Sequence, residues 1–129
     1  MTDVDQRVAE LESRLGTHRR AFDPPADPPD EERAVRYLRD GFGQAVAVYV
    51  EARTGDGPPT VIDPQTFDRL EDVLNGWLEL YAACYGADID AEFTVREAAE
   101  LLVDTHDLRD VAQLLTKVPG RDEGGTNVK

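Results

Sequence analysis

The stretch from residue 63 to residue 85 limits the possible folds of this chain more than any other. It contains the only tryptophan, Trp77, and the only cysteine, Cys84. Its apolar residues recur at steps of three and four, which is the repeat of an α-helix. These residues are Phe67, Leu70, Leu74, Trp77, Tyr81 and Cys84. Further apolar residues widen this surface beyond one stripe, so we expect a central helix that is covered on two sides.

The two ends of this helix are also marked in the sequence. Asp63 is suited to the N-cap and Pro64 to the first helical position. Ile62 and Phe67 stand at the positions of a hydrophobic staple, and Gly86 is suited to end the helix. The sequence therefore predicts a helix over 63–85.

Similar patterns predict the other helices, at 2–15, 30–53, 94–104 and 107–118. Asp30 and Asp107 are expected N-caps, and Thr94 with Glu97 forms a capping box. The helix at 94–104 carries the apolar residues Val95, Ala98, Ala99, Leu102 and Val103. The helix at 107–118 is expected to face the core with Leu108, Val111, Leu114, Leu115 and Val118. Four prolines between residues 24 and 29 exclude helix and sheet and favour an extended tether.

We therefore predict an all-α fold, a compact bundle of about four helices with an N-terminal helix on a Pro-rich tether. The expected parts are an N-terminal helix (1–16), a linker (17–29), a helical domain (30–120) and a flexible tail (121–129). An α+β fold with a small hairpin at 45–62 is the alternative, because residues 45–50 are rich in valine. We prefer a helix because its repeat continues through Gly41 and Gly43, which would mark a kink or a close helix crossing.

The charge of the chain is strongly acidic. The net charge is −13, and the 14 basic residues include only two lysines, Lys117 and Lys129, so 12 are arginine. Ser13 is the only serine. In this composition the chain resembles the proteins of extreme halophiles, the haloarchaea in particular. The resemblance implies a fold that needs salt, because at molar salt the Debye length falls to about 3 Å and repulsion between carboxylates is screened.

Several classes of site are not expected. One cysteine excludes an internal disulfide and a cysteine zinc cage. Asp88, Asp90 and Glu92 resemble the opening of a calcium loop, but Phe93 and Ala99 stand where that loop needs glycine and glutamate. We find no P-loop, dinucleotide fingerprint or HExxH motif. We therefore expect no cofactor, no metal and no enzymatic activity.

The expected location is the cytoplasm, because the N-terminus does not resemble a signal peptide and no apolar run approaches the length of a membrane span. No membrane contact is expected. The favoured function is a non-enzymatic protein–protein interaction or adaptor module. Helix 2–15 carries a narrow apolar seam of Val4, Val8, Leu11 and Leu15. This seam would either dock on the domain itself or bind a protein partner or a second copy.

A DNA-binding regulator is the alternative function. The helices at 94–104 and 107–118 have helix-turn-helix proportions. Arg109, Gln113 and Lys117 fall on one face of the second helix and would contact bases or phosphates. Asp107 and Asp110 oppose this hypothesis, because they lie at the end of the helix that would approach DNA.

Overall fold

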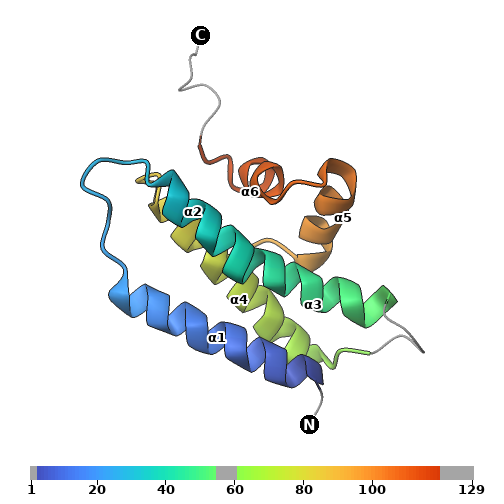
Figure 1. The fold of residues 1–129 in the computed structure, drawn as a ribbon. Helices are drawn as coiled ribbons and strands as arrows, with labels where there is room; N and C mark the ends of the chain where they lie inside the picture. Colours follow the sequence, from blue (N-terminus) through green and yellow to red (C-terminus); the bar gives the residue numbers. More distant parts are fainter. Residues whose placement is uncertain (1–2, 55–60, 120–129) are drawn as a thin grey trace.

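The computed structural model describes residues 3–54 and 61–119, and these residues form an all-α bundle without a strand (Figure 1). The elements are α1 (Asp3–Ala21), α2 (Glu31–Tyr37), the π-helical turn η1 (Leu38–Phe42), α3 (Gly43–Thr54), α4 (Pro64–Ala83), α5 (Val95–Thr105) and α6 (Leu108–Thr116). The predicted fold class is confirmed. The alternative hairpin at 45–62 is wrong for residues 45–54, which are helical. Its segment 55–60 and the predicted tail 121–129 lie outside the described residues.

Helix α4 is the centre of the bundle, as predicted. It contacts α1 on one side, the continuous α2–η1–α3 rod on another, and α5 and α6 beyond (Figure 1). Trp77 is completely buried and lies 5.5 Å from the His18 ring and 5.8 Å from the Tyr37 ring, between centroids. Its indole N–H has no hydrogen-bond acceptor in the described structure. The core therefore closes around this residue.

The predicted starts of α4 and α5 and the predicted end of α4 are observed. The Asp63 carboxylate accepts a hydrogen bond from the Thr66 backbone N–H at 3.0 Å, and this bond lowers the pKa of Asp63. Thr94 and Glu97 form the reciprocal capping box that begins α5. Gly86 follows α4 with a φ of 80°, a value that glycine adopts without strain.

The glycines that interrupt the predicted helix 30–53 lie where helices cross closely. Leu38–Phe42 forms a π-helical turn, which lets the helix continue from α2 into α3. A Cβ atom on Gly41 would lie 2.0 Å from a ring carbon of Trp77. A Cβ atom on Gly76 would lie 2.4 Å from Leu15. Glycine is therefore needed at both positions for α2–η1–α3 and α1 to approach α4.

Helix α1 differs from its prediction in length and in role. It passes Gly16 and ends at Ala21, so the linker begins later than expected. The predicted partner seam is buried inside this chain, with relative exposures of 9%, 0%, 2% and 4% for Val4, Val8, Leu11 and Leu15. Of the two alternatives, docking on the domain is the one observed. A partner or a second copy cannot use this seam in the folded chain.

The Pro-rich segment is held against the domain rather than serving as a free tether. The Arg33 guanidinium lies 4.6 Å from the centroid of the Phe22 ring and donates a hydrogen bond to the Asp23 carbonyl at 2.9 Å. The Asp30 backbone N–H donates to the Cys84 carbonyl at 2.8 Å. Both ends of the segment are thus fixed, one by α2 and the other by the end of α4.

A polar ladder on α4 holds the extended segment before α5. Asn75 makes two hydrogen bonds with the backbone of Phe93, at 2.8 and 2.9 Å. The carboxylate of Glu79 accepts from the Ala91 N–H at 3.1 Å, and that of Glu71 accepts from the Val95 N–H at 3.0 Å. Every fourth residue of a helix rises about 6 Å, close to the spacing of alternate residues in an extended chain, so the two repeats match.

Arginine side chains tie separate helices together. Pairs with carboxylates join α1 to α3, α4 to α1 at two places, and α6 to α2. These pairs are Arg7–Glu51, Arg69–Glu12 at 2.7 Å, Arg19–Glu79 at 3.4 Å and Arg109–Glu31 at 3.9 Å. The planar guanidinium suits such pairs better than lysine does, which gives the arginine-rich composition a structural use.

Candidate functional site

The residues of the DNA-binding hypothesis are partly used inside the fold. Arg109 pairs with Glu31 of α2 at 3.9 Å, and the Gln113 amide donates to the Pro119 carbonyl at 3.0 Å. Lys117 caps α6 in the left-handed conformation and is exposed. Asp107 caps the first turn of α6, so an acid stands where a phosphate would have to approach. Arg109 and Gln113 thus have contacts within the chain, and Lys117 is exposed.

Cys84 and His106 are not arranged as a catalytic pair. Cys84 is buried, and this burial raises the pKa of its thiol. His106 is exposed in the turn between α5 and α6, where its left-handed backbone ends α5. Among the described residues no hydrogen bond joins the two side chains. Cys84 thus packs in the core, and His106 lies at the end of α5.

The acidic residues are spread over the surface near the α4 ladder. A groove beside α4 includes Asp68, Asp72 and Glu92, together with the ladder residues Glu71 and Glu79. Across residues 3–54 and 61–119, no group of three or more potential ligands is arranged to hold a metal ion. The ladder carboxylates accept backbone N–H groups, so their role in this groove is to position the chain.

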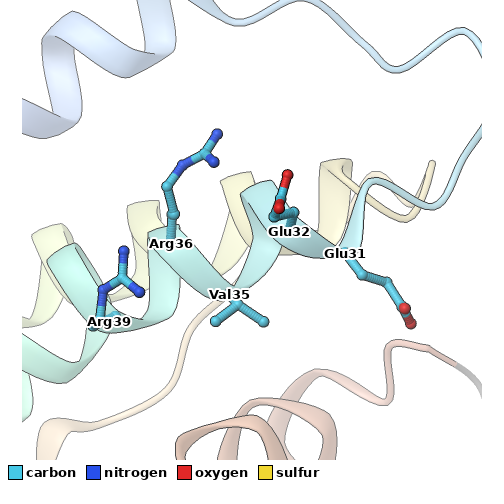
Figure 2. A pocket seen from close by; sticks show the side chains of 5 residues that line it. All are labelled: Glu31, Glu32, Val35, Arg36 and Arg39. Carbon is cyan, nitrogen blue, oxygen red and sulfur yellow. The ribbon is translucent and has the colours of Figure 1, made fainter.

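Arg36 of α2 and Arg39 of η1 belong to a solvated charged face. Figure 2 shows Glu32, Arg36 and Arg39 projecting from one side of the helix, with Val35 and Glu31 elsewhere on its circumference. Arg39 pairs with its neighbour Asp40 at 3.2 Å. The shallow hollow here has Val35 as its only apolar lining residue. The surface here thus combines charged groups with apolar area.

A second hollow, between α3 and α5, combines apolar and charged groups. We call it the α3–α5 hollow, and its volume is about 330 Å³. It is lined by Tyr49, Arg53, Arg96, Ala99, Glu100 and Val103. Val103 has a relative exposure of 68%. Leu114, on α6, was expected inside and is 45% exposed.

The position of Val103 on α5 explains its exposure. Val95, Ala98 and Ala99 face the core, and Val103 follows Ala99 by one turn on the flank of that stripe. The Arg53 guanidinium lies 5.5 Å from the Tyr49 ring centroid, and Arg96 pairs with Glu100 at 3.2 Å. An apolar surface between arginines is suited to bind a side chain or a peptide segment. The sequence alone gave no sign of it, because its residues come from two helices more than 40 positions apart.

The fold places the chain in the class of small helical bundles that wrap around one buried helix. None of the helices in the described ranges combines the length and apolar character that a bilayer span requires. The chain belongs to the family described as Domain of unknown function (DUF8055), whose model matches residues 2–120. No curated protein and no solved structure matches it.

Proposed function

We propose that this protein is a non-enzymatic protein–protein interaction module of a halophile cytoplasm, and that it docks its partner in the α3–α5 hollow. The observation that carries this proposal is the exposure of Val103, 68%, in a hollow lined by Tyr49 and Ala99. A valine that becomes fully buried contributes about 1.5 kcal/mol, so a partner would gain affinity by covering it. The buried seam of α1 cannot provide this contact.

The surroundings of the hollow support docking rather than catalysis. Its charged residues, Arg53, Arg96 and Glu100, include no nucleophile and no base held in a buried site. Its width, between two helices, is suited to one or two side chains of a partner. The DNA-binding alternative has less support, because Arg109 and Gln113 already have contacts within the chain.

Capture of a partner at native salt tests the proposal. The full chain would be immobilised in molar KCl and exposed to an extract of the cells that encode it. Val103→Asp places a charge in the hollow, and Leu114→Asp places the same charge on α6, away from it. We expect one partner to bind the wild type and the Leu114 variant and to be lost with the Val103 variant. Circular dichroism would first show that both variants are folded.

Two results would contradict the proposal. One is that the wild type retains no partner above the background of an empty matrix. The other is that the Val103 and Leu114 variants retain the partner equally well, because docking would then not involve the hollow.

A further inference from the structure

We infer that the α3–α5 hollow recognises a peptide segment with an apolar anchor residue flanked by a carboxylate. This inference rests on the proposed docking function and specifies the chemistry of the partner. Val103, Ala99 and Tyr49 would take the apolar anchor, and Arg53 would bind the carboxylate.

Arg53 differs from most of the described arginines because it has no acidic partner within residues 3–54 and 61–119. Seven of the described arginines form ion pairs, and Arg53 is not among them. Two described acids close to it, Glu51 on the same helix and Glu100 in the same hollow, are engaged elsewhere: Glu51 pairs with Arg7, and Glu100 pairs with Arg96. In a chain of net charge −13, the lining of this hollow is positive, with two arginines and one glutamate.

The contact with Tyr49 prepares Arg53 for a carboxylate. The guanidinium lies over the aromatic ring, 5.5 Å from its centroid, which restricts the side chain without using its N–H donors in a hydrogen bond. A planar guanidinium in this state can donate two parallel hydrogen bonds to a carboxylate. Arg96 is 75% exposed, so it can leave Glu100 and bind a second acid at little cost.

At high salt, the contacts within the hollow decide which partner binds. At molar salt the Debye length is about 3 Å, so the negative charge of the whole protein does not repel an acidic segment over a distance. Only groups in contact then contribute. In the α3–α5 hollow these are apolar residues, two arginines and one glutamate, Glu100, which already pairs with Arg96. The hollow thus favours a carboxylate next to an apolar residue, whereas the rest of the surface favours basic partners.

Selection from a displayed library of random 12-residue peptides tests this inference. The full chain would be the bait in molar KCl. We expect enriched peptides to carry an aliphatic or aromatic residue with Asp or Glu within four positions. Their affinity should fall by about tenfold or more in Arg53→Glu, because charge-assisted hydrogen bonds are lost. Arg20→Glu is the matched control, since Arg20 is exposed on α1 and has no ion pair in the described part of the chain, and we expect no change.

The outcomes separate this inference from the docking proposal. Enrichment of basic or neutral peptides, or of none above the unselected library, would overturn the inference. An affinity that falls in Val103→Asp but stays unchanged in Arg53→Glu would leave docking intact and refute the role of the carboxylate. Restored binding of Arg53→Glu to a peptide whose acid is replaced by lysine would support the direct contact.

Discussion

Replacement of Gly41 by alanine tests how closely the α2–η1–α3 rod crosses α4. The added Cβ atom would lie 2.0, 2.3 and 2.4 Å from three carbons of the fused Trp77 ring. An ordinary contact begins near 3.4 Å, so the atoms must separate by 3.4 − 2.0 = 1.4 Å. Trp77 is fully buried and its ring cannot bend, so the helices themselves must move.

Two opposing effects determine how much stability Gly41→Ala loses. Alanine favours a helix over glycine by about 1 kcal/mol. Overpacking a core by one methyl group typically costs about 1–3 kcal/mol, and a displacement this large belongs at or above the upper end. We therefore expect Gly41→Ala to lower the free energy of unfolding by about 2 kcal/mol.

The assay is urea unfolding at constant molar KCl, followed by circular dichroism so that the signal does not depend on Trp77. Gly16→Ala is the matched control, because its Cβ atom would meet only the Arg20 side chain at 3.4 Å. It should raise stability by about 0.5–1 kcal/mol. In a Trp77→Phe background, the cost of Gly41→Ala should shrink because the ring that it strikes is smaller. A Gly41→Ala protein as stable as the wild type would refute the close crossing.

Three further predictions concern salt, the α4 ladder and pH. Dialysis from molar KCl to dilute buffer should lower the melting temperature, because repulsion among the carboxylates is no longer screened; a melting curve indifferent to KCl would contradict this. Asn75→Ala should lower the free energy of unfolding by about 1–3 kcal/mol, because the N–H and C=O of Phe93 lose their partners in a partly buried position, and urea unfolding measures the loss. The pKa of Asp63 is lowered from 3.8 in the folded chain, so its capping bond stabilises the fold above that pH and is lost as the pH falls through the folded pKa. The difference in melting temperature between the wild type and Asp63→Ala should therefore narrow below pH 3.8, and a constant difference would show that the carboxylate charge is irrelevant.

The features that the sequence predicted well are local ones. Asp63, Thr94 and Asp107 cap their helices as expected, because a cap needs only the next three residues. Trp77 lies in the core because the apolar repeat of α4 surrounds it in the sequence itself.

The features that the sequence missed depend on contacts between distant segments. Helix α1 continues past Gly16 because tertiary contacts of its last turns outweigh the low helix propensity of glycine: His18 packs on Trp77, and Arg19 pairs with Glu79. The α3–α5 hollow around Val103 could not be predicted, because it depends on where α3 lies beside α5. The same holds for the bonds between Asn75 and Phe93, which are 18 residues apart.

The α4 ladder fixes the first residue of α5, whereas the rest of α5 packs against α3 and α6. Its first residue, Val95, is bonded to Glu71, whereas Val103 lies eight residues further along, or about 12 Å at 1.5 Å per residue. Tilting α5 by roughly 5° about its anchored end would leave Val95 in place and shift Val103 by about 1 Å. The width of the α3–α5 hollow is therefore set by how α5 packs against α3 and α6, at the end of α5 that lies away from the ladder.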